Sequence, residues 1–138
     1  MGHQSLIALV LINRPVTEVW EYWIRAEHIK QWNIPFYDWH CPVVENDVTA
    51  GGRFKFYMGK KDGSDGFEHT GIYSQVTPFE IIAYTLNDGR QAWIEFQQID
   101  NNTIVRERFE PESHTSIELQ KEFCQSVLNR FKNYVEQQ

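Results

Sequence analysis

The C-terminal stretch TSIELQKEFCQSVLNRFKNYVE, residues 115–136, decides the fold. Apolar side chains recur along it at the spacing that places them on one face of an α-helix, namely Leu119, Phe123, Val127, Phe131 and Val135. Thr115 followed three residues later by Glu118 has the pattern of a capping box, so we expect the helix to begin there. Such a helix is roughly 30 Å long, about the width of a small domain. The rest of the chain must therefore cover its whole apolar side.

Residues 4–13 form a short, aliphatic and β-branched run that predicts a first strand. Pro15 ends it and suits the first turn of a helix, and Val16, Val19, Trp20 and Trp23 follow at helical spacing. A second short helix is expected over residues 27–32. A loop then carries residues 33–38.

From residue 39 onward the pattern takes the period of β-strands. Six strands are expected over residues 39–45, 53–60, 68–76, 80–86, 91–98 and 103–109. Short turn segments rich in Gly, Asn, Asp and Pro separate them, and connections of this length join antiparallel neighbours. The expected order is β-α-α-β-β-β-β-β-β-α, an α+β fold in which a curved antiparallel sheet of six to seven strands encloses the C-terminal helix. Residues 1–138 are expected to form one domain.

Several of these segments together resemble one known family. They are Pro15-Val16 with Val19-Trp20, Trp32, Gly51-Gly52-Arg53-Phe54, His69-Thr70-Gly71-Ile72-Tyr73 with Pro78, and the closing run from Phe131 to Glu136. Their order and spacing resemble the START-like (SRPBCC) superfamily, in the branch named after the C-terminal domain of the activator of heat-shock protein 90 ATPase. The resemblance implies the helix-grip fold, also called Bet v 1-like, and a cavity between the sheet and the last helix.

Three classes of function follow from this resemblance. Members of the superfamily bind lipids or other apolar molecules, so a small-molecule binding protein for an apolar lipid or aromatic ligand is the main hypothesis. The aromatic content of 14 % suits such a cavity. Some relatives catalyse cyclisation or hydrolysis in the same cavity, and an activator of heat-shock protein 90 ATPase would instead bind a chaperone. A chaperone partner and a homodimer both stay open.

Glu107 is the main anomaly of the pattern, because it shares a strand face with Val105 and Phe109. A buried carboxylate is costly unless it is paired. We therefore expect Glu107 to be exposed at a strand end, paired with an Arg or Tyr, or placed in a pocket with a raised pKa. In a pocket it would contact ligand or act as an acid or base.

The remaining candidate residues for ligand contact come from strand parity, from the loop before the second strand and from the helix. In this fold the loop resembles a lid over the cavity mouth. The candidates are Phe36, Trp39, Phe56, Met58, His69, Tyr73, Tyr84, Phe96, Phe123 and Val127. Trp20, Trp23 and Trp32 are expected to pack against the sheet.

Other partners and cofactors are not expected. The net charge of -6 and the lack of a dense basic run argue against nucleic acid and anionic membranes. Nucleophile-elbow, dinucleotide and phosphate-loop motifs are missing, and the cysteine and histidine spacing does not suit a metal. Cys41 and Cys124 are expected to be reduced. Without a signal-peptide pattern or a long apolar run, the expected location is the cytoplasm.

Overall fold

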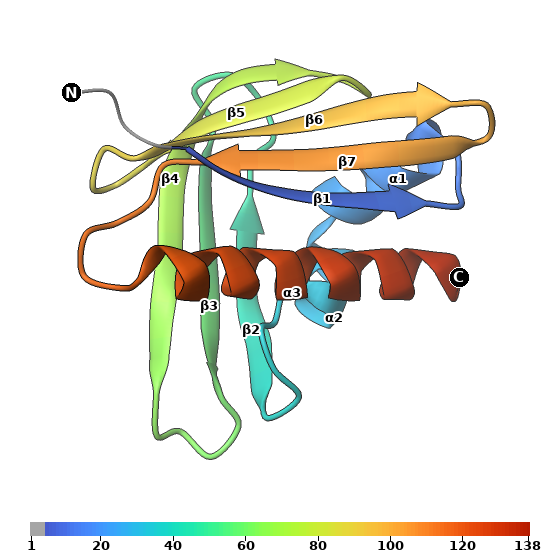
Figure 1. The fold of residues 1–138 in the computed structure, drawn as a ribbon. Coiled ribbons are helices and arrows are strands. Elements are labelled where there is room, and N and C mark those ends of the chain that lie inside the picture. The colour runs from blue at the N-terminus through green and yellow to red at the C-terminus, as the bar shows by residue number, and fades with distance from the viewer. Residues whose placement is uncertain (1–4) are drawn as a thin grey trace.

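A strongly curled antiparallel sheet closes around one long helix in the computed structural model, which describes residues 5–138 (Figure 1). The elements are β1 (Leu6–Ile12), α1 (Val16–Ile24), α2 (Ala26–Trp32), β2 (Trp39–Asn46), β3 (Arg53–Lys60), β4 (Gly66–Thr77), β5 (Ile81–Leu86), β6 (Gln91–Ile99), β7 (Asn102–Phe109) and α3 (Ile117–Glu136). Their order confirms the predicted helix grip. Residue 4, the expected start of the first strand, lies outside the described residues.

The sheet has seven strands in the order β1-β7-β6-β5-β4-β3-β2, and every neighbouring pair is antiparallel. Its ladder is interrupted between Tyr73 and Gln75 of β4 and between His40 and Val43 of β2. Such irregularities bend strands and increase their twist. The sheet therefore wraps around α3 instead of lying flat beneath it.

Helix α3 begins one residue later than the capping-box pattern indicates. Ser116 is its N-cap, and the Ser116 hydroxyl accepts a hydrogen bond from the backbone N–H of Leu119. Thr115 instead belongs to the preceding loop, where its N–H donates to the carboxylate of Glu112. The capping-box prediction is thus wrong in register, because Glu112 satisfies the loop N–H groups and leaves the cap to Ser116.

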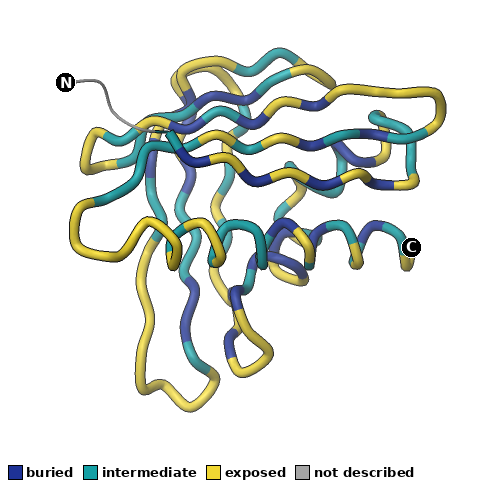
Figure 2. Tube along the Cα trace, viewed as in Figure 1, coloured by how far each residue is buried: buried dark blue, intermediate teal, exposed yellow. Residues whose placement is uncertain are grey.

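The two halves of α3 lie in different surroundings (Figure 2). Leu128, Phe131 and Val135 in the C-terminal half are almost fully buried. The Phe131 ring lies 4.9 Å from that of Trp23 and 4.7 Å from that of Trp32, which come from α1 and α2. In contrast, Phe123, Cys124 and Val127 keep part of their surface accessible. Trp23 and Trp32 thus pack against α3 at one end of the fold, where they also border the cavity described below. The other end of α3 is less densely packed.

The outer edge of β1 is covered by side chains of α3. The Gln125 amide accepts a hydrogen bond from the N–H of Leu9 at 3.1 Å and donates to the carbonyl of Leu9 at 3.0 Å. Lys132 donates to the carbonyl of Leu11, and the Glu136 carboxylate accepts from the N–H of Asn13. An edge strand with free backbone groups tends to pair with other chains. Polar side chains of α3 therefore act in place of a further strand.

Replacing Gln125 tests this edge contact. Gln125→Leu leaves the N–H and carbonyl of Leu9 without their partners, and we expect the free energy of unfolding to fall by about 1–2 kcal/mol. Leucine has a helix propensity similar to that of glutamine, so the helix itself is not weakened. Urea denaturation followed by circular dichroism measures the change.

Asn129→Ala is the matched control, because Asn129 contacts the Gln125 amide from solvent but not β1. A loss of stability for Asn129→Ala as large as that for Gln125→Leu would contradict a specific role of the edge contact.

Candidate functional site

A cavity of about 690 Å³ lies between the N-terminal half of α3 and the inner face of the sheet. Phe54, Phe56 and Met58 from β3 form one wall, and Phe123, Cys124 and Val127 from α3 form the roof. At Gly71 a Cβ would lie 2.8 Å from the ring of Phe54 and 2.5 Å from the carbonyl oxygen of Thr85. Glycine at this position allows the Phe54 ring to lie flat over β4. The volume of the cavity is in the usual range for small-molecule pockets, roughly 300–1,000 Å³.

Most of the residues predicted from the sequence line this cavity. They are Phe56, Met58, His69, Tyr73, Tyr84, Glu107, Phe123 and Val127. The strand parity explains this result, because alternate residues of β3, β4, β5 and β7 point to the concave face that α3 covers. Whether they contact a ligand stays a prediction.

Phe36, Trp39 and Phe96 do not line the cavity. Phe96 packs against Trp20 at 5.1 Å between ring centroids, because α1 covers that end of β6. Trp39 is buried in a separate small cluster with Cys41 and Met58.

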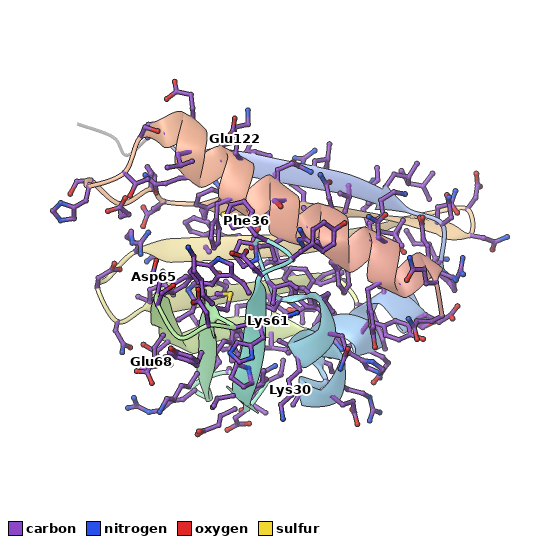
Figure 3. All side chains as sticks on the ribbon, turned by 90° about the horizontal axis from the view of Figure 1, so that it is seen from below. Lys30, Phe36, Lys61, Asp65, Glu68 and Glu122 are labelled. Atoms are coloured by element: carbon purple, nitrogen blue, oxygen red, sulfur yellow. The ribbon has the colours of Figure 1, made fainter. Side chains whose placement is uncertain are left out.

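The loop carrying Phe36 lies beside α3 (Figure 3). Asn33 of this loop lines the cavity, and Phe36 does not. The Ser126 hydroxyl, at 3.0 Å, and the Arg130 guanidinium both donate hydrogen bonds to the carbonyl of Pro35 and hold the loop there. The Phe36 side chain is left half exposed.

Glu107 is partly buried and has no partner in the described part of the chain. Its strand neighbours are Ala8 on β1 and Ile94 on β6, so both sides are apolar. Among residues 5–138 no side chain or backbone group hydrogen-bonds its carboxylate, whereas every fully sealed side-chain nitrogen or oxygen atom there has a partner. The Glu107 carboxylate must therefore face the open space of the cavity. Desolvation raises the pKa of Glu107 from 4.5 to about 7.

Three further polar groups surround the same space. Burial raises the pKa of the Tyr84 hydroxyl and of the Cys124 thiol, and the nearby charge of Glu107 raises both further. Burial, with a smaller contribution from the charge of Arg90, lowers the pKa of His69 from 6.5 to about 4. At neutral pH the cavity thus presents a neutral imidazole, a phenol and a thiol around one titrating carboxyl group.

The lining also contains polar residues that the sequence did not indicate, among them Asn46 and Arg90. Asn46 at the end of β2 accepts a hydrogen bond from the Tyr73 hydroxyl, and its amide donates to the carbonyl of Ile24. Arg90 lies in the turn directly before β6, where its guanidinium pairs with Asp88 at 2.8 Å. Both residues occur in turn segments, and local sequence does not indicate which way a turn side chain points. Only the closure of the sheet brings them to the cavity.

The profile of the family described as activator of Hsp90 ATPase homolog 1-like protein matches residues 13–136, which is nearly the whole chain. The chain belongs to this family. Its fold thus confirms the START-like superfamily and the branch that the sequence resembles.

Solved structures place this family member among close structural relatives. It is similar to an AHSA1-like protein from Aeromonas hydrophila, with 31% identity, a TM-score of 0.91, and coverage of 97% of this chain and 93% of that one. A protein from Cytophaga hutchinsonii has 38% identity and a TM-score of 0.84, over 96% of this chain and 92% of that one.

A more distant relative is described as a dimer. The Aha1 dimer from Colwellia psychrerythraea is 11% identical, with a TM-score of 0.75 over 96% of each chain, and shows the shared fold alone. Comparison with curated proteins found no match.

Residues 5–138 contain neither a membrane-spanning helix nor a group of metal ligands. In that range no helix has the length and apolar character needed to cross a membrane. Within it, too, His, Cys, Asp and Glu side chains do not gather in groups of three or more that could hold a metal ion. Cys41 and Cys124 are free thiols.

The raised pKa of Glu107 predicts a pH-dependent stability with a defined sign. Between its usual value of 4.5 and the folded value of about 7, the folded protein holds a proton that the unfolded chain has lost. Stability is therefore lost as pH rises through this window. Between pH 5 and pH 8 we expect the unfolding free energy of the wild type to fall by on the order of 2 kcal/mol relative to that of Glu107→Gln.

Urea denaturation at several pH values measures this difference. His69 has the opposite effect, because its lowered pKa makes stability rise between pH 4 and 6.5. The two effects partly cancel in the wild type, so the comparison with the variant is needed to see the effect of Glu107. Glu95→Gln on the exposed outer face of β6 is the control and should show no such trend. A pH-independent difference for Glu107→Gln would contradict the buried, unpaired state of Glu107.

Proposed function

We propose that this protein binds a small, mainly apolar molecule in the cavity beneath the N-terminal half of α3. One observation carries the proposal, namely a cavity of about 690 Å³ that is partly open to solvent and has largely aromatic and aliphatic walls. Empty apolar space in a protein interior is unfavourable because the lining side chains lose packing contacts. A ligand of matching size would restore those contacts.

The division of α3 supports this proposal. If the helix served only to fill the core, apolar side chains would pack along its full length as they do at Phe131 and Val135. Instead Phe123 and Val127 line open space, and Leu119 at the cavity mouth is 54% exposed. The helix is held firmly at one end and roofs a cavity at the other.

Catalysis is a second candidate, of the cyclase or hydrolase kind, and one observation favours it. A carboxyl group with a pKa of about 7 beside a phenol is suited to general acid–base chemistry. However, the Cys124 thiol has a raised pKa and stays protonated, so it is not an activated nucleophile. The cavity thus supports binding better than reaction. The chaperone partner, the homodimer and the cytoplasmic location stay predictions.

A cavity-filling substitution tests the binding function. Val127→Trp places an indole in the cavity, and we expect the affinity for the neutral fluorescent probe N-phenyl-1-naphthylamine to fall at least about tenfold. Fluorescence titration of the purified protein measures the dissociation constant, and circular dichroism verifies the fold.

Glu122→Trp is the matched control, since Glu122 lies on the exposed side of the same helix (Figure 3). It adds the same ring without entering the cavity and should leave the affinity unchanged. If the wild type does not bind the probe, or if Val127→Trp binds it as well as the wild type, the cavity is not the binding site.

A further inference from the structure

The position of Glu107 restricts which apolar molecules the cavity can accept. Its carboxylate lies on the inner face of β7, between Ala8 and Ile94 and below Cys124. It has no hydrogen-bond partner among the described residues, and it faces the cavity. Any molecule that fills this space removes the remaining water from the carboxylate. An entirely apolar ligand would therefore leave a buried acid without a partner, at a substantial cost.

We propose that the natural ligand is an apolar molecule with a hydrogen-bond donor, a hydroxyl or an amine, at the end that meets Glu107. This inference rests on the proposed function and specifies its ligand class. The apolar body lies among Phe56, Phe67 and Phe123, where the lining is aromatic. The donor head reaches the inner face of β7 and binds the carboxylate directly.

The groups around Glu107 are consistent with a donor head. Tyr84, whose pKa the charge of Glu107 raises, is a neutral side chain that can accept or donate a second hydrogen bond to the head group. The ring of His69 lies 5.9 Å from that of Tyr84 and adds a further neutral polar group to the cavity. The positive charge of Arg90 acts on the cavity, where it lowers the pKa of His69, but Asp88 at 2.8 Å partly offsets it. An anionic head next to Glu107 would meet like charge in a low-dielectric site. The site therefore selects against ligands that carry a carboxylate at this end.

Donor binding should strengthen as the Glu107 carboxyl group ionises. The charge of Glu107 acts on Tyr84 from β5 and on Cys124 from α3. The other titratable or charged groups that line the cavity are His69 and Tyr73 from β4, Arg90, which pairs with Asp88 in the β5–β6 turn, and Glu110 and Glu112 after β7. Between pH 6 and pH 8 only Glu107 among the shifted groups changes its protonation, because the pKa of His69 is about 4 and those of Tyr84 and Cys124 are raised. A trend in this window reports on Glu107.

Two matched probe pairs test the inference on the full chain. The first is 2-naphthol against 2-methoxynaphthalene, which keeps the oxygen but lacks the donor. The second is 2-naphthylmethylamine against 2-ethylnaphthalene, which has the same shape without the amine. Isothermal titration calorimetry at pH 8 should show that at least one donor-bearing probe binds about tenfold or more tightly than its match, the effect of one hydrogen bond to a charged group.

Glu107→Leu should abolish that preference without weakening the binding of the donor-free probes. Glu107→Gln, which keeps the shape and an acceptor oxygen but not the charge, should reduce the preference and remove its rise between pH 6 and pH 8. If Glu107→Leu does not fold, Glu107→Gln still tests the role of Glu107. The pair that shows the preference tells whether the head group is a hydroxyl or an ammonium.

The outcomes separate the two proposals. Equal affinities within both pairs in the wild type would overturn the donor head while leaving the apolar binding site in place. A preference that persists unchanged in both Glu107 variants would overturn the role of Glu107. Failure of all four probes to bind, the donor-free ones included, would overturn the proposed function itself.

Discussion

The packing of Phe131 against Trp23 and Trp32 is the contact on which the remaining structure depends. These three rings come from α3, α1 and α2, and Leu128 and Val135 extend the same buried contact along α3. Aromatic side chains bury large areas, so this cluster holds the helix firmly by its C-terminal half. The N-terminal half is thereby positioned over the sheet without having to pack against it. A cavity can exist there because the stability that positions its roof comes from elsewhere.

A second constraint comes from the free edge of β1. Gln125, Lys132 and Glu136 lie along one side of α3 and hydrogen-bond backbone groups that point away from β7. These contacts fix the rotation of α3 about its own axis, since a different rotation would move the three side chains off the strand. The same rotation points Phe123, Cys124 and Val127 into the cavity. Edge protection and cavity lining are therefore two consequences of one helix orientation.

Within that cavity the unpaired carboxyl group of Glu107 is unfavourable in its ionised form. Its raised pKa shows that the fold disfavours the ionised form, and nothing in the described residues compensates it. A leucine at this place would pack well between Ala8 and Ile94. Polar groups kept in apolar surroundings at a cost to stability are typical of binding and catalytic sites. The cost of Glu107 to the stability of the fold is therefore consistent with a role of this residue in the proposed binding function.

The sequence by itself determined the element order, because periodicity and turn residues are local properties. Strand parity also determined that Phe56, Tyr84 and Glu107 point to the concave face, since side-chain alternation follows from backbone geometry alone. Only the tertiary structure decided how far along each strand the cavity extends. Phe96 has the right parity yet lies under α1, and Arg90 comes from a turn but reaches the lining. These outcomes depend on the curl of the sheet and on which half of α3 is packed, and both arise from contacts between residues distant in the chain.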